Sequence, residues 1–395
     1  MGAPALQGLR VLDLGQIYAG PYAGFLLAMA GADVVKVEPP QGEFLRARAA
    51  VSGGIIPFAM LNANKRAITL NLKEPRGREL LLSLVERADV LLENYSATTL
   101  ESLGLGWDCL RARNPRLVYA SATGYGRSGP YRDFPAMDLT IQAMAGIMSV
   151  TGFPDRPPVK AGPAIVDYMG GVHLYAAIVT ALVQRARTNE GQQVEVSLQE
   201  AIYPALSSNL GLHFAGKGTQ RTGNRHGGLA SSPYNVYPTS DGYIAIICVS
   251  EQHWRSLVAT MGQPALADDE RFRDLKGRVR NMDALDALIG AWTAPLTKEQ
   301  AFRALIAADV PCAPVRDLDE VVGDTHMRQR GMLHDIGHPQ FGALVLPSSP
   351  LRLHGAEAPP RRESATLGEH NAEVYSEWLG LSAEQLDALK AHHVI

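Results

Sequence analysis

The first forty residues alternate between apolar runs and turn-forming residues in an order that strongly limits the fold. Mostly apolar residues occupy positions 9–14, Gly20-Pro21 follows as a turn, and a second apolar stretch at 22–30 ends at Gly31. Pro at the first helical position and Gly just after the last one are typical of helix ends. Residues 32–38 then form a Val-rich run. The pattern predicts a strand–helix–strand unit, and such units build parallel sheets that bind ligands at the carboxyl ends of their strands.

The same alternation continues as far as residue 122. We expect strands at 67–72, 89–93 and 117–122, with a helix at 76–87. Short turns containing Gly, Pro or Asn separate the segments, which is typical of an open, mostly parallel sheet. The predicted fold class is therefore α/β, with a Rossmann-like parallel sheet. A nicotinamide or flavin site is not favoured, because the glycines that follow the first strand do not have the GxGxxG spacing.

Composition argues against several other classes of function. Of the 395 residues, 46% are apolar and 19% are charged, and the net charge is −3, so nucleic acid is not an expected partner. No stretch of about 20 apolar residues stands out, so we expect no membrane span and a cytoplasmic protein. Cys109, Cys248 and Cys312 are odd in number and far apart, which predicts neither a disulfide framework nor a metal site.

The segment 163–173 contains the strongest candidate for a catalytic side chain. Asp167 lies where a short apolar segment gives way to Gly170-Gly171 and then to an apolar run that ends near Arg187. A carboxylate can be held there on an exposed turn. The alternative is a helix N-cap, because Asp commonly caps an apolar helix. The two roles are compatible, since the N-terminus of a helix favours an anionic carboxylate.

Several further blocks of sequence point to one known family. They are residues 11–21, 31–38, 64–73, 89–94, 124–130, 191–197, 241–244, 311–315 and 367–370. Together these blocks resemble the class III CoA-transferase family, which includes formyl-CoA transferase, carnitine CoA-transferase and α-methylacyl-CoA racemase. The resemblance runs in order through the whole chain, and it favours the catalytic interpretation of Asp167 over the cap.

The resemblance implies a mechanism with an aspartate nucleophile. An Asp at the position of Asp167 attacks the acyl-CoA thioester to give a mixed anhydride, and the CoA thiolate then forms an aspartyl-CoA thioester. The acceptor carboxylate reverses the sequence. The implied partners are an acyl-CoA donor and a carboxylic acid acceptor, and no metal or redox cofactor is expected. We expect Asp167 to have an ordinary carboxyl pKa of about 4, which would leave it ionised at neutral pH.

Met137 and Asp138 distinguish two branches of the family. The racemase resembles this chain but has a His where Met137 stands, so that two bases face the substrate. A thioether exchanges no proton at neutral pH, which favours transfer over racemisation. Asp138 is the expected supporting acid, and its alternative is a helix cap. An acyl-CoA racemase or isomerase and a non-catalytic acyl-CoA-binding relative remain the alternative functions.

The resemblance also assigns a lid and a substrate pocket. Gly227 and Gly228 align with a glycine-rich loop whose N–H groups would stabilise the thioester oxygen, and the alternative is an ordinary surface turn. Tyr18 either hydrogen-bonds an acyl oxygen or only packs. The residues expected to contact substrate or CoA are Gln16, Tyr18, Ala19, Leu70, Asn71, Leu72, Lys73, Asn94, Tyr95, Ser96 and Met137.

Two sets of cations are candidates for binding anionic groups of the substrates. Lys36, Arg66 and Lys73 are candidates for the CoA phosphates. A second set could bind a second carboxylate and so favour a dicarboxylic donor such as succinyl-CoA; it consists of Arg46, Arg48, Arg225 and His226.

The domain prediction combines local patterns with the resemblance. We expect a large CoA-binding domain at 1–200, a linker at 201–225, a smaller α+β domain at 226–316 and a return to the large domain at 317–395. Family resemblance also implies an interlocked homodimer, in which each chain forms a ring threaded by the other.

Overall fold

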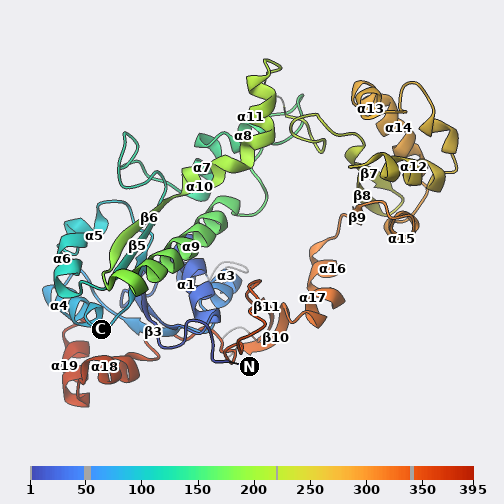
Figure 1. The fold of residues 1–395 in the computed structure, drawn as a ribbon. Helices are drawn as coiled ribbons and strands as arrows, with labels where there is room; N and C mark the ends of the chain where they lie inside the picture. The colour runs from blue at the N-terminus through green and yellow to red at the C-terminus, as the bar shows by residue number, and fades with distance from the viewer. Residues whose placement is uncertain (1, 49–54, 219–220, 339–341) are drawn as a thin grey trace. The chain divides into compact units, whose positions relative to one another are not determined.

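The computed structural model describes residues 2–48, 55–218, 221–338 and 342–395 (Figure 1). The chain forms two compact units. Unit 1 comprises Met1–Ile141, Pro163–Tyr203 and Asp324–Ile395, and unit 2 comprises Gln142–Gly162 and Pro204–Gly323.

These boundaries differ from the predicted ones at three places, one of which is residues 317–323, which belong to unit 2 and not to the return segment. Residues 142–162 group with unit 2 rather than with the large domain, because Gly223 N–H donates to Gly152 O (2.9 Å) and Arg221 Nε donates to Phe153 O (3.0 Å). The predicted linker at 201–225 contains a 3₁₀ turn, Tyr203–Leu206, and a helix, α11, Ser207–Phe214. The polar linker that we expected is therefore confined to the residues after this helix.

Unit 1 is built on a six-stranded sheet whose strands all run parallel. The strand order is β3-β2-β1-β4-β5-β6. This is the order of doubly wound Rossmann sheets, which confirms the predicted parallel sheet and puts the topological switch point between β1 and β4. The strands are β1 (Arg10–Asp13), β2 (Asp33–Glu38), β3 (Arg66–Thr69), β4 (Val90–Glu93), β5 (Val118–Thr123) and β6 (Gln192–Ser197).

Helices cover both faces of this sheet. Successive strand residues point to opposite faces, so Val11 lies in one apolar core and Leu12 in the other. The first core is completed by α1 (Ala19–Met29) and α9 (Ile165–Thr188). The second is completed by α4 (Pro75–Val85), α6 (Trp107–Arg113), α18 (Asn371–Leu379) and α19 (Ala383–Ala391). The remaining elements of unit 1 are α2 (Phe44–Ala47), α3 (Ile55–Leu61), α5 (Thr99–Ser102), α10 (Leu198–Ile202), α17 (Thr325–Gln329), β10 (Leu333–His338) and β11 (Gly342–Pro347). A further helix, α7 (Asp138–Met144), begins in unit 1 and ends in unit 2.

Unit 2 contains a three-stranded antiparallel sheet with helices packed around it. Trp254, Phe272 and Leu285 lie in its buried core. The strands are β7 (Tyr234–Thr239), β8 (Gly242–Ile247) and β9 (Cys312–Pro314), in that order. The helices are α8 (Ile147–Val150), α11, α12 (Glu251–Thr260), α13 (Leu275–Arg280), α14 (Met282–Thr293), α15 (Lys298–Ala307) and α16 (Leu318–Val322), with a 3₁₀ turn at Pro264–Ala267.

By length and composition alone, α9 could cross a membrane, which the sequence analysis did not anticipate. Its residues Leu174 and Ile178 are fully buried in the core of unit 1, against the sheet and α1. We infer that the helix is apolar because it is the core helix of a doubly wound sheet.

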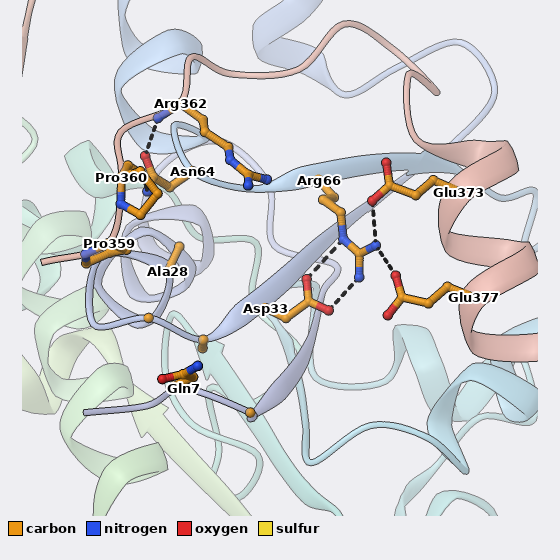
Figure 2. A pocket seen from close by; sticks show the side chains of 13 residues that line it. Gln7, Ala28, Asp33, Asn64, Arg66, Pro359, Pro360, Arg362, Glu373 and Glu377 are labelled. Carbon is orange, nitrogen blue, oxygen red and sulfur yellow. Dashed lines mark hydrogen bonds and ion pairs between the residues drawn. The ribbon is translucent and has the colours of Figure 1, made fainter. Parts of the chain in front are cut away.

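Arg66 joins the C-terminal segment to the start of the sheet. Its guanidinium donates to both carboxylate oxygens of Asp33 on β2 and to Glu373 (2.9 Å) and Glu377 (2.6 Å) on α18. Figure 2 shows these carboxylates around Arg66 at one side of a cavity of about 400 Å³, which Arg362 also lines. Arg66 thus makes its ion pairs at the amino ends of the strands, and its role at the CoA phosphates stays a prediction.

We expect Arg66→Ala to lower the free energy of unfolding by about 2 kcal/mol, because it leaves three carboxylates without their shared cation. Denaturant unfolding measures this loss. The matched control is Arg113→Ala, which also removes a cation from two carboxylates, those of Glu79 and Glu86, but on the exposed surface. We expect no measurable loss there. Equal effects of the two substitutions would contradict this stabilising role of Arg66.

Candidate active site

Asp167 is the third residue of α9, which begins after Ala164. The carboxylate of Asp138, the first residue of α7, accepts hydrogen bonds from Val166 N–H (2.9 Å) and Asp167 N–H (3.3 Å). Asp138 therefore satisfies N–H groups of the first turn of α9, which is the task of a capping side chain. The alternative interpretation, in which Asp167 is itself the N-cap, is wrong, because the cap position is occupied by Ala164.

The Asp167 carboxyl group is in an unusual electrostatic environment. Burial, the larger cause, and the nearby charge of Asp138 together raise its pKa to about 7. Among the residues that the structure describes, no side chain or backbone group donates a hydrogen bond to it that would offset these effects. The expectation of an ordinary pKa near 4 is therefore wrong. A sequence pattern does not reveal how deeply a carboxyl group is buried.

The loop that connects β1 to α1 lies at the switch point of the sheet. Gln16 N–H donates to Asn94 Oδ1 (2.6 Å), and Asn94 Nδ2 donates back to Gln16 O (2.9 Å). Asn94 directly follows β4, the strand beside β1. The Tyr18 ring packs on the ring of Tyr168, with centroids 5.9 Å apart, so the loop reaches the residue next to Asp167. The structure thus brings Gln16, Tyr18, Asn94 and Asp167 into one region.

The glycine pair after Asp167 allows two helices to approach closely. A Cβ atom on Gly171 would come within 2.8 Å of Ala19 O in the first turn of α1. One on Gly170 would collide with the side chain of Leu198 on α10. The pair is therefore a packing feature that sets α1 against α9, and Ala19 is buried at this contact.

The predicted pocket at the end of β3 is partly covered by the C-terminus. Leu70 is buried in the core, and Asn71 N–H donates to Val394 O (2.8 Å). Lys73 is exposed, and Leu72 packs against the same core. After α18 the chain forms a further helix, α19, and Val394 lies three residues beyond the end of this helix. We did not foresee the contact of Asn71 with Val394, because partners more than 300 positions apart leave no local pattern.

The end of β4 contains a second buried carboxyl group. Glu93 Oε2 accepts from Tyr95 N–H (2.6 Å), and Glu93 Oε1 accepts from Tyr119 Oη (3.0 Å). Burial raises the pKa of Glu93 to about 7. Tyr95 is therefore held at the strand end by its backbone, whereas Ser96 is exposed and hydrogen-bonds Thr99.

The predicted lid lies in unit 2 and is described there by itself. Gly228 N–H donates to His226 Nδ1 (3.1 Å), and Gly227 O accepts from Asn209 Nδ2 (3.4 Å). The N–H of Gly228 is therefore already used within the segment. The role of Gly227 and Gly228 as donors to a thioester oxygen stays a prediction, which requires this segment to change its hydrogen bonds.

Most of the predicted anion-binding cations already have carboxylate partners. Arg46 pairs with Glu38 (2.7 Å), and Arg225 pairs with Asp286 (2.6 Å) and Asp283 (2.7 Å). Lys36 is buried beside Glu43. Of the cations proposed from the sequence, Lys73 and Arg48 are exposed. Within the described ranges, no three His, Cys, Asp or Glu side chains gather as a metal-binding group.

Comparison with known proteins identifies the family. The profile of CoA-transferase family III matches residues 6–371. Formyl-CoA:oxalate CoA-transferase of Streptomyces avermitilis is 38% identical, with 99% of each chain covered, and succinyl-CoA–D-citramalate CoA-transferase of Chloroflexus aurantiacus is 36% identical over 99% of this chain and 98% of the relative. This chain belongs to CoA-transferase family III.

Solved structures agree with this assignment. A CaiB/BaiF family protein from Brucella suis has a TM-score of 0.83 and 35% identity, covering 96% of this chain and all of that one. Rv3272 from Mycobacterium tuberculosis has a TM-score of 0.83 and 30% identity, covering 94% and 99%. A mutant of Rv3272 with an aspartate replaced by alanine has also been crystallised. The protein is thus a CoA-transferase with the CaiB/BaiF fold.

The sequence analysis of this CoA-transferase missed a buried group of charges beneath the β1–α1 loop. Lys65 Nζ donates to Asp13 Oδ2 (2.7 Å) and Pro21 O (2.8 Å), and burial lowers the pKa of Lys65 to about 8. Lys36 Nζ donates to Gly15 O. A signal was present, because Asp13 and Lys36 interrupt strands that otherwise read as apolar.

The raised pKa of Asp167 predicts the pH dependence of CoA transfer. A carboxyl group with a pKa near 7 is mostly protonated below that pH, so we expect kcat/KM to fall about tenfold per pH unit in the acid range. Asp138→Asn removes a negative charge but keeps an oxygen that accepts from the N–H groups of α9. This substitution should move the acid limb of the kcat/KM profile to lower pH. It should reverse only part of the rise in the pKa of Asp167, because burial, the larger cause, remains.

Steady-state kinetics of both proteins across the pH range measures these limbs. The control is Asp133→Asn, which removes a charge from an exposed side chain a few residues away. We expect it to leave the limb in place. A limb near pH 4 in the unmodified enzyme, or a limb that Asp138→Asn moves to higher pH, would refute this explanation.

Proposed function

We propose that this enzyme transfers CoA from an acyl-CoA donor to a carboxylic acid with Asp167 as the covalent nucleophile. The observation that supports the proposal is the Asp167 carboxyl group itself. It lies in the first turn of α9 beside Asp138, and no group in the described part of the chain donates a hydrogen bond to it. A carboxylate without such hydrogen bonds keeps its lone pairs available for attack.

The proposed reaction has four steps. An Asp167 oxygen attacks the thioester carbon, and CoA leaves as a thiolate, which gives an acyl-aspartyl anhydride. The thiolate then attacks the Asp167 carbonyl carbon and releases the donor acid, leaving an aspartyl-CoA thioester. The acceptor carboxylate attacks the same carbon and expels the thiolate. Finally the thiolate attacks the acceptor acyl carbon and frees Asp167. Acyl transfer of this kind involves no oxidation or reduction, so the proposal includes no metal or redox cofactor.

Two observations favour transfer over the alternatives. Met137, which replaces the second base of the racemase, is 62% exposed and has no titratable group. The curated relatives in Streptomyces and Chloroflexus are named as CoA-transferases. A non-catalytic acyl-CoA-binding role leaves unexplained why two carboxyl groups are held together at the start of α9.

Succinyl-CoA is our proposed donor. A relative from Agrobacterium fabrum, 35% identical over 95% of this chain and 96% of its own length, is named succinate–glutarate CoA-transferase. Of the cations proposed for the second carboxylate, Arg46 and Arg225 are committed to ion pairs. Arg48 and His226 therefore remain the candidates.

We expect Asp167→Asn to lower kcat by about 1,000-fold or more, because an amide is not a competent nucleophile here. The wild type, incubated with succinyl-CoA or with a panel of other acyl-CoA donors, should gain the mass of CoA less one water at Asp167. Intact-mass measurement and peptide mapping detect this adduct, and hydroxylamine removes it. Asp138→Asn is the matched control, because it retains the nucleophile. An Asp167→Asn enzyme with wild-type turnover would exclude this mechanism.

We further propose that the enzyme is an interlocked homodimer in the cytoplasm. Large apolar side chains are exposed in each unit, for example Phe134 and Leu139 in unit 1 and Phe214 and Leu318 in unit 2. Exposed apolar groups of this size are typical of surfaces that a partner covers. One face of α9, which includes Leu174 and Ile178, is buried against the sheet, and this supports a soluble enzyme.

An interlocked dimer should not exchange its subunits under native conditions, because threaded rings separate only if a chain unfolds. We expect two differently tagged preparations to stay unmixed after prolonged co-incubation and to form mixed dimers after joint unfolding and refolding. Native mass spectrometry measures the fraction of mixed dimers. Mixing without denaturant would show that the dimer is not interlocked.

A further inference from the structure

The β1–α1 loop is held in a backbone conformation that its sequence disfavours. Ile17 has φ of 64°, in the left-handed region. A β-branched side chain is strained there, and such residues persist only where the surrounding structure holds them. The flanking residues are Gln16 and Tyr18, which the sequence analysis expects to contact substrate or CoA.

Glu43, at the start of α2, supplies the contact that holds this strained residue. Its Oε2 atom accepts from Ile17 N–H at 3.2 Å and lies 3.4 Å from Lys36 Nζ. Glu43 is itself fixed, because its own N–H donates to Glu38 Oε2 (3.1 Å). The loop is also held by the paired hydrogen bonds between Gln16 and Asn94. Glu43 and Asn94, from two separate parts of the chain, thus fix two consecutive residues of the loop.

Stability alone does not explain a carboxylate at this position. Glu43 is 3% exposed, and its Oε1 atom has no hydrogen-bond partner in the part of the chain that the structure describes. Burying a charged pair usually costs as much free energy as it returns, and apolar residues of similar volume are often at least as stable. Glu43 is therefore explained better by the geometry that it enforces than by stability.

We propose that Glu43 is a positioning residue for CoA transfer. Through Ile17 it fixes Gln16 and Tyr18, and Tyr18 packs on Tyr168, the neighbour of Asp167. Lys36 also holds the loop, because its ammonium group pairs with Glu43 and donates to Gly15 O in the same loop. Loss of the carboxylate lets Ile17 relax toward ordinary backbone angles and displaces the side chains on either side. This inference rests on the proposed function, in which Asp167 is the nucleophile.

The test compares substitutions that separate positioning from folding. Glu43→Leu removes the acceptor, and we expect kcat/KM to fall about tenfold or more, because small displacements of a reacting group cost that much. Glu43→Gln keeps an oxygen acceptor for Ile17 N–H and should recover activity to within about threefold of the wild type. Asp33→Ala is the control. It removes an ion pair at the amino ends of the strands, away from the β1–α1 loop, and should lower the melting temperature without lowering kcat/KM.

A second comparison uses the strain at Ile17. Glycine adopts left-handed backbone angles readily, so in an Ile17→Gly enzyme residue 17 depends less on its hydrogen bond to Glu43 to keep a positive φ. We expect the loss caused by Glu43→Leu to shrink to about threefold in that background, which a double-mutant cycle measures. An undiminished loss would overturn the proposal. So would wild-type kcat/KM in Glu43→Leu, or an equal loss in Glu43→Gln.

Adduct formation at Asp167 in the wild type is measured in the same series. An active wild type without an adduct contradicts the proposed mechanism. A wild type that forms the adduct, together with a Glu43→Leu enzyme of full kcat/KM, contradicts the positioning role alone.

Discussion

The site depends most on the contact between the Asp138 carboxylate and the first turn of α9. That carboxylate satisfies N–H groups that the helix itself cannot satisfy, and it also places a negative charge beside Asp167. The same contact therefore fixes the position of the proposed nucleophile and makes its charged form less favourable. Together with burial, this contact explains why the pKa of a carboxyl group in a helix first turn rises, although the helix dipole alone would lower it.

The remaining parts of the site follow from how closely α1 and α9 approach. Gly171 leaves no side chain between the first turn of α1 and α9, so the β1–α1 loop and the start of α9 meet at the switch point of the sheet. Beneath them lies a group of buried charges, in which Lys65 and Lys36 bind carbonyl groups of the loop region. These contacts hold a strained backbone at Ile17 in place, as is common where a loop has to present side chains accurately.

The sequence predicted much of the fold because its signals there are local. Apolar runs with helix and turn signals predicted the strand–helix alternation, and the parallel sheet followed from it. Blocks of sequence spread along the chain, such as 11–21, 64–73 and 89–94, indicated the family. Local patterns failed where partners are far apart in the chain. Examples are the grouping of residues 142–162 with unit 2 and the contact of Asn71 with Val394.

The sequence by itself thus determined the fold class, the family and the identity of the proposed nucleophile, since each depends on residue order and type. Only the tertiary structure decided the state of those residues. It raised the pKa of Asp167, committed Arg66 and Arg225 to ion pairs, and assigned the capping of α9 to Asp138. The physical reason is that desolvation and charge pairing depend on distances through space, which the order of residues along the chain does not fix.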